Sequence, residues 1–90
     1  DGDYGPLKDA RISVLDRGFI FGDGVYEVLP AYGGRIFRFG EHMDRLDRSL
    51  RELRIANPHT RDEWLAIARR LIADRQAAGV PNQLIYLQVT

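Results

Sequence analysis

The sequence predicts an α+β domain in which an antiparallel sheet carries two helices packed on one face. Three observations support this fold class. Residues 25–29 and 83–90 have the β-branched and aromatic composition of strands. A Tyr-Gly-Gly-Arg turn at residues 32–35 joins the first of them to a returning strand. Two segments of helical periodicity follow before the last strand, and this separation of strands from helices favours an antiparallel sheet covered on one side.

The composition is that of one small soluble domain, residues 1–90, with 44% hydrophobic and 29% charged residues. Thirteen basic side chains balance thirteen acidic ones, which predicts no attraction to nucleic acid or to an anionic membrane surface. The absence of cysteine excludes a disulfide framework and a thiolate metal site, and we expect no metal centre. The sequence has no signal-peptide pattern, so a cytoplasmic protein is expected.

The first strand is predicted to follow a glycine-rich loop, residues 18–24, whose glycines suit a structural turn. The loop is not expected to bind phosphate, because a strand and not a helix N-terminus comes after it. Side chains alternate along the strand, so Tyr26 and Val28 should share one face and Glu27 should lie on the other. Residues 36–39 are expected to form the returning strand.

From Glu41 the period changes to that of an amphipathic helix. Its apolar stripe consists of Met43, Leu46, Leu50 and Leu53. The Asn57-Pro58 pair should end the helix, because a residue before proline avoids the helical region. On the outer face the i,i+4 spacing predicts two ion pairs. These are Asp44 with Arg48 and Asp47 with Arg51.

A second helix is predicted from Thr60, because Thr60 and Glu63 fit a capping box. Its apolar stripe consists of Trp64, Ala68, Leu71 and Ile72. Gly79 stands where a C-cap glycine belongs. This helix is expected to support the sheet, and the final strand, residues 83–90, should return to it.

Two residues are candidates for a binding site. Tyr26 presents an aromatic hydroxyl that suits a ligand carboxylate or a cofactor oxygen, although its position alone favours a core tyrosine. Arg45 lies at the boundary of the apolar stripe, where it either pairs with Glu41 or reaches inward to a bound anion. The residue pattern leaves both alternatives open. His42, at the start of the helix, is expected to orient or cap rather than to act as a ligand or base.

DRGFIFGDGVYEV at residues 16–28 and EHMDRLDRS at residues 41–49 together resemble the N-terminal domain of class IV pyridoxal phosphate-dependent aminotransferases. Within that family, FGDGVYEV is most similar to the D-amino-acid (D-alanine) aminotransferases, and the similarity runs from Ala10 to Thr90. The resemblance implies the N-terminal part of a longer two-domain, homodimeric enzyme. Such an enzyme uses pyridoxal 5'-phosphate to transfer an amino group from a D-amino acid to 2-oxoglutarate.

The resemblance also implies roles for single residues. Arg45, the arginine of E-H-x-x-R-L, would bind the cofactor phosphate. Tyr26 would contact the substrate carboxylate, and Val28 would line the substrate pocket. In the family, the lysine that binds the cofactor covalently belongs to the C-terminal domain, and the only lysine here, Lys8, does not match its context. We therefore expect no catalytic residue in these ninety positions, and expect them to be inactive on their own.

Other functions remain open from the sequence. Within the family these are a branched-chain aminotransferase and an aminodeoxychorismate lyase. For an aminotransferase, the resemblance implies amino-acid and 2-oxo-acid substrates. Outside it, the chain would be a non-catalytic fragment that binds an anion or a partner protein. Because a chain of this length buries only a little over about 60% of its unfolded surface, a partner domain or second subunit is expected.

Overall fold

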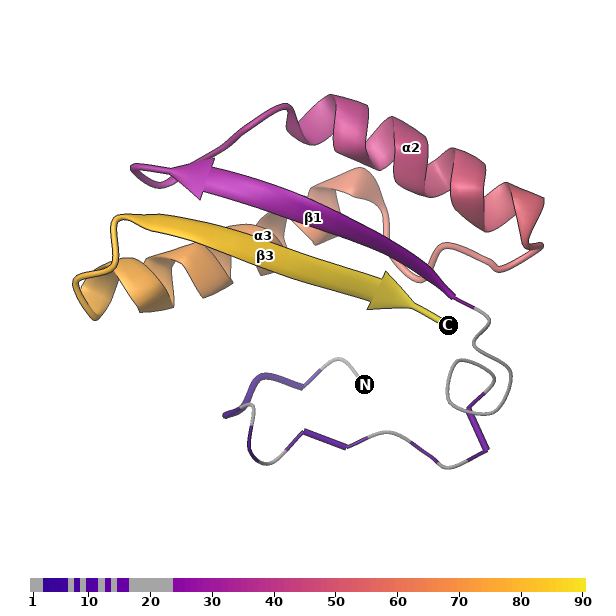
Figure 1. The fold of residues 1–90 in the computed structure, drawn as a ribbon, viewed down its shortest axis with the longest axis horizontal. Helices are drawn as coiled ribbons and strands as arrows, with labels where there is room; N and C mark the ends of the chain where they lie inside the picture. Colours follow the sequence, from indigo (N-terminus) through magenta and orange to yellow (C-terminus); the bar gives the residue numbers. More distant parts are fainter. Residues whose placement is uncertain (1–2, 7, 9, 12, 14, 17–23) are drawn as a thin grey trace.

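The computed structural model describes residues 3–6, 8, 10, 11, 13, 15, 16 and 24–90. In chain order its elements are β1 (Val25–Tyr32), β2 (Arg35–Ile36), α2 (Phe39–Glu52), α3 (Arg61–Ala77) and β3 (Asn82–Val89). They form the predicted α+β architecture (Figure 1). Apart from Gly24, the predicted glycine-rich loop lies outside the described residues.

The sheet is antiparallel throughout, in the order β2-β1-β3. β1 and β3 lie side by side along their whole length, from Val25 opposite Val89 to Tyr32 opposite Asn82 (Figure 1). The two-glycine turn brings β2 against the end of β1, where Tyr32 pairs with Arg35. β1 is therefore the central strand, and its side chains have neighbours from β3 on both faces of the sheet.

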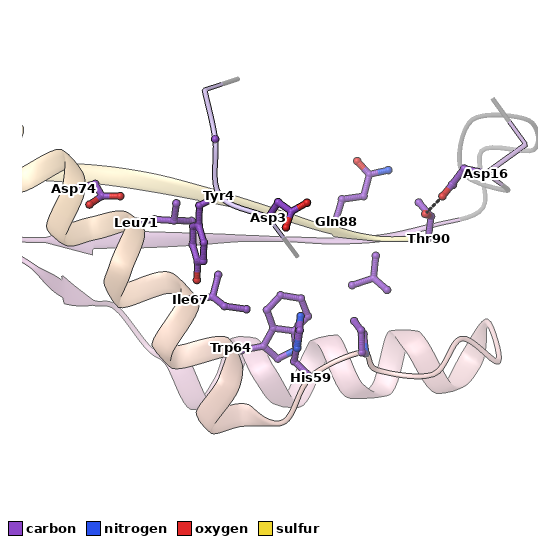
Figure 2. A pocket seen from close by; sticks show the side chains of 13 residues that line it. Asp3, Tyr4, Asp16, His59, Trp64, Ile67, Leu71, Asp74, Gln88 and Thr90 are labelled. Atoms are coloured by element: carbon purple, nitrogen blue, oxygen red, sulfur yellow. Dashed lines mark hydrogen bonds between the residues drawn. The ribbon is translucent and has the colours of Figure 1, made fainter. Parts of the chain in front are cut away.

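The core lies between the sheet and α2. Leu46 is fully buried, and Met43 and Leu50, each about one turn away, are 1% exposed. They pack against four buried apolar side chains on the inward face of the sheet, which are Val25, Leu29, Leu87 and Val89. Trp64 of α3 packs at the edge of the same cluster, and both helices lie on one face of the sheet (Figure 2). The predicted arrangement of two helices on one face is confirmed.

The returning strand is shorter than predicted. The sequence predicts a strand over residues 36–39, whereas β2 ends at Ile36 and α2 begins at Phe39. Arg38 adopts the left-handed conformation, with φ 53° and ψ 45°, and directs the chain away from the sheet into the helix. Phe39 then packs against the core cluster, while Phe37 stays half-exposed.

The C-terminal end of α2 also differs from the prediction. Leu53, which the pattern assigns to the apolar stripe, is the C-cap residue and is half-exposed. Arg54 follows in the left-handed conformation, with φ 57°, and Ile55 N–H then donates to Leu50 O at 2.9 Å. A left-handed arginine thus flanks α2 at each end, Arg38 before it and Arg54 after it.

The two ion pairs predicted on the outer face of α2 do not form. Asp44 and Asp47 both accept from the guanidinium of Arg61, the first residue of α3. Arg61 Nη2 lies 3.2 Å from Asp47 Oδ2. Arg48 is exposed and has no ion-pair partner in the described part of the chain. Contacts between the helices have replaced contacts within one helix.

α3 begins and ends as predicted. Thr60 Oγ1 accepts from the Glu63 backbone N–H at 3.2 Å, and Glu63 Oε1 accepts from the Thr60 backbone N–H at 2.9 Å, which confirms the capping box. Ala68 and Ile72 are buried. Gly79 follows the C-cap with φ 84°, a conformation that favours glycine. Neither of the helices in the described ranges is long and apolar enough to cross a membrane.

Candidate functional site

The candidate site is organised around Glu27, a carboxylate on the inward face of β1. Its neighbours on that face, Val25 and Leu29, belong to the core, and Glu27 itself is only 3% exposed. It is the one buried polar or charged residue in the part of the chain that the structure describes. A carboxylate buried without partners is strongly unfavourable, so the partners of Glu27 define the site.

Two residues of α2 provide those partners. Arg45 Nε donates to Glu27 Oε1 at 2.6 Å and Nη2 donates to Oε2 at 2.9 Å, which is a two-point contact along one edge of the guanidinium. His42 Nδ1 lies 2.9 Å from Glu27 Oε2. An ionised carboxylate only accepts hydrogen bonds, so His42 Nδ1 carries the proton and donates it. The 3.4 Å approach of Arg45 Nη2 to that nitrogen therefore joins two donors and is not a hydrogen bond.

These contacts keep Glu27 ionised. The hydrogen bond from Arg45 lowers the pKa of Glu27 below its ordinary value of 4.5, burial opposes this effect, and the hydrogen bond from His42 adds to the lowering. The hydrogen bond between Arg45 and Glu27 also raises the pKa of Arg45, and the guanidinium is charged at any physiological pH. The Glu27–Arg45 pair therefore carries one charge of each sign and is neutral as a unit.

Arg45 reaches inward, as one of the two alternatives from the sequence requires, and its partner is not Glu41. Glu41 instead accepts from Arg38 at 3.2 Å. The Arg45 side chain is 58% exposed, because only one edge of its guanidinium meets Glu27. Of the five N–H donors of an arginine, the two on Nη1 and one on Nη2 remain, and no described residue accepts from them. This open edge has the geometry that binds carboxylate or phosphate oxygens.

Tyr26 and Val28 lie on the outward face of β1, opposite to the helices. Tyr26 is 64% exposed, so the interpretation as a core tyrosine, which its position favours, is wrong. Its ring stacks on Tyr86 of β3, with the ring centroids 5.7 Å apart and the planes at 11°. Val28 stands directly opposite Tyr86 in the sheet register. The Tyr26 hydroxyl makes no hydrogen bond to any described residue, which leaves it available to a ligand.

The predicted site residues thus lie on the two sides of one strand. Arg45 meets β1 through Glu27 on the inward face, while Tyr26 and Val28 point outward. Sequence reasoning missed Glu27 and Tyr86 as site residues. An acidic side chain in the inward phase of a strand, between two apolar ones, is a signal for Glu27, because such a residue needs a partner. Tyr86 becomes visible only with the register between β1 and β3.

A hollow of about 930 Å³ lies elsewhere, between the start of the chain, α3 and the end of β3 (Figure 2). None of the candidate site residues lines it. Its walls include three aspartates, Asp3, Asp16 and Asp74. No arginine or lysine is among the described residues that line it, so a phosphate or carboxylate is better matched by Arg45 than by this hollow.

A small α+β domain that presents an arginine edge and a free tyrosine hydroxyl on two sides of its central strand suits an anionic ligand. Residues 24–90, which contain both groups, match the family model for amino-transferase class IV. The chain belongs to the class IV aminotransferase family.

The chain is also similar to individual proteins of known name. The chain is 38% identical over 90 residues to the D-alanine aminotransferase of Staphylococcus epidermidis, an alignment that covers all of this chain and 31% of that protein. It is 39% identical over 83 residues to the D-alanine aminotransferase of Listeria monocytogenes, which covers 92% of this chain and 28% of that protein. The chain is 32% identical over 90 residues to the D-alanine aminotransferase of Staphylococcus aureus, an alignment that covers 100% of this chain and 31% of that protein. The chain thus spans less than a third of the length of these curated relatives.

Proposed function

We propose that this chain is the N-terminal domain of a two-domain, pyridoxal phosphate-dependent aminotransferase that acts on D-amino acids, with D-alanine as the amino donor and 2-oxoglutarate as the acceptor. The family and the names of the relatives support the reaction class. The observation that carries the proposal is the open guanidinium edge of Arg45, held from behind by a buried carboxylate.

The residues present fit the phosphate of the cofactor. A phosphate presents pairs of oxygens that two donors in one plane match, and Nη1 and Nη2 of Arg45 provide such donors. Because Glu27 holds the other edge, little freedom of the guanidinium remains to be lost on binding. Pyridoxal phosphate, when bound, supplies the electron sink that labilises the substrate α-proton.

On the outward face of β1, Tyr26 and Val28 form part of the proposed substrate wall. The Tyr26 hydroxyl donates to the substrate carboxylate, and the stack with Tyr86 restricts the ring to the orientation that allows this. Val28 has no polar atom to satisfy and provides an apolar surface for the substrate side chain.

The remaining groups of the reaction, including the lysine that binds the cofactor, would come from other parts of a full-length protein. We extend the proposal to a cytoplasmic homodimer. The outward face of the sheet supports contact with another domain or subunit, because Tyr26, Leu84 and Tyr86 are all largely exposed there.

The test of the reaction compares three substrates with the full-length protein. Turnover of D-alanine with 2-oxoglutarate should exceed turnover of L-leucine and of aminodeoxychorismate. Preferred turnover of L-leucine or of aminodeoxychorismate would instead identify one of the other two activities of the family. A full-length protein that binds pyridoxal phosphate and turns over none of the three would contradict the proposal.

The test of the phosphate site compares two arginines of α2. Arg45→Ala in the full-length protein should raise the dissociation constant of pyridoxal phosphate at least about tenfold, because a two-donor contact with a dianion is lost. Arg48→Ala should leave it unchanged, since Arg48 is exposed and has no ion-pair partner among the described residues. Equilibrium dialysis measures both values. Equal loss in the two variants, or loss in neither, would remove Arg45 from the site.

A further inference from the structure

Glu27 stands where the pattern of β1 calls for an apolar residue. Val25 and Leu29, two positions away on either side, belong to the hydrophobic cluster that covers the same face. Replacing a buried ion pair by apolar side chains is often neutral or stabilising, so stability of the fold does not by itself account for a carboxylate here. Its strongest contact is with the arginine for which we propose a ligand role.

The contacts of Glu27 fix the orientation of that arginine. A long, largely exposed arginine samples many rotamers when nothing holds it. Glu27 binds Nε and Nη2 of Arg45 together, which sets the plane of the guanidinium and leaves the edge formed by Nη1 and Nη2 open. His42 Nδ1 in turn donates to Glu27 at 2.9 Å, from a side chain that is largely buried. The contacts therefore run from His42 through Glu27 to Arg45.

The charge of Glu27 acts in the opposite direction. It neutralises Arg45, so a phosphate dianion is attracted less strongly than it would be by the arginine alone. If net charge decided the affinity, removing the charge of Glu27 would tighten binding. If the orientation of Arg45 decides it, the same change weakens binding. The two effects have opposite signs, and one substitution separates them.

We propose that Glu27 is a positioning residue, which directs the Nη1–Nη2 edge of Arg45 toward the phosphate group of pyridoxal phosphate. His42 holds the Glu27 carboxylate in place for this role. The inference rests on the proposed function. Glu27 affects cofactor binding only through Arg45, and it contacts neither the cofactor nor the substrate.

The experiment measures the dissociation constant of pyridoxal phosphate for variants of the full-length protein, by equilibrium dialysis. Glu27→Gln should raise this constant about tenfold, because the amide oxygen accepts one of the two arginine hydrogen bonds and the NH₂ group opposes the other. Glu27→Asp keeps the charge and shortens the side chain, and it should also weaken binding. Glu41→Gln is the control, since Glu41 is an exposed carboxylate that pairs with Arg38.

The same substitution in a second background shows whether Glu27 acts through Arg45. Glu27→Gln added to Arg45→Ala should cause no further loss of cofactor, whereas a general structural defect would add to it. Tighter or unchanged binding in Glu27→Gln, or an equal further loss in the Arg45→Ala background, overturns the inference. Should Glu27→Gln not fold, Glu27→Asp decides by the same criterion. Failure of the proposed function is measured separately, in the unsubstituted protein. If that protein binds pyridoxal phosphate but does not transaminate, only the proposed function fails. If it does not bind pyridoxal phosphate, both the proposed function and this inference fail.

Discussion

Replacing Tyr26 by phenylalanine removes one hydroxyl and leaves the ring. In the structure that hydroxyl has no hydrogen-bond partner among the described residues, and the ring is held by its stack with Tyr86. The described chain loses no hydrogen bond, so the thermal unfolding midpoint of the full-length protein should not change. If the hydroxyl donates to the substrate carboxylate, the variant loses one hydrogen bond to a charged group, worth about 1.5–3 kcal/mol.

That free energy corresponds to a loss of roughly 10- to 150-fold in kcat/KM for D-alanine. Initial rates with 2-oxoglutarate measure it, with the pyruvate product followed through lactate dehydrogenase, and the pyridoxal phosphate content of the same sample should stay constant. Tyr32→Phe is the matched control, because Tyr32 is also exposed, on the same strand, at its far end. Equal kcat/KM for Tyr26→Phe and the unsubstituted protein would refute the substrate role. An equal fall in Tyr32→Phe would assign the effect to the whole sheet face.

Three further predictions concern stability of the full-length protein. Leu46→Ala should destabilise this domain by about 2–5 kcal/mol and lower its thermal midpoint, because Leu46 is fully buried between α2 and the sheet. Leu53→Ala is the control and should lower the thermal midpoint less, because Leu53 is half-exposed at the end of α2. Thr60→Ala should cost about 1 kcal/mol through loss of the capping box, while Thr60→Ser, which still caps, should restore most of it. The third prediction is a pH dependence, because the pKa of Glu27 is lowered in the folded state. The contribution of ionised Glu27 to the free energy of unfolding is present above its ordinary pKa of 4.5 and is lost as the pH falls through the folded-state pKa. Glu27→Gln should flatten the fall of the thermal midpoint in that acid range, and an unchanged acid limb would contradict this.

Much of the fold could be predicted because several of its signals are local. The alternation along β1 correctly assigned Tyr26 to one face and Glu27 to the other. Thr60 and Glu63 satisfy each other within one turn, so the start of α3 follows from four consecutive residues. The strand predicted over residues 36–39 is too long, because a run of three apolar residues and one arginine fits either a strand or the start of a helix. The left-handed backbone of Arg38, which decides between them, has no signal in the sequence.

The contacts of the site were less predictable, because the partners are far apart in the chain. The sequence offers Glu41, four residues before Arg45 on the same helix, as its partner, whereas Arg45 pairs with Glu27 on the strand beneath the helix and Glu41 accepts from Arg38. The i,i+4 pairs on an exposed helix face are worth only about 0.2–0.5 kcal/mol each, so a better-placed group on another element displaces them. Arg61 does this for both aspartates of α2. Predicting such pairs requires the packing of the helices, which the pattern of α2 alone does not contain.

The two left-handed arginines, Arg38 and Arg54, stand just outside the ends of α2. Between Arg38 and Arg54 the helix places both Leu46 against the sheet and Arg45 against Glu27. One residue inserted before Arg45 would rotate both side chains by about 100° about the helix axis. The core and the open guanidinium edge would be lost in the same step. We therefore expect a length change within α2 to disturb the core and the Arg45–Glu27 contact together, because Arg45 and Leu46 are consecutive residues of one helix.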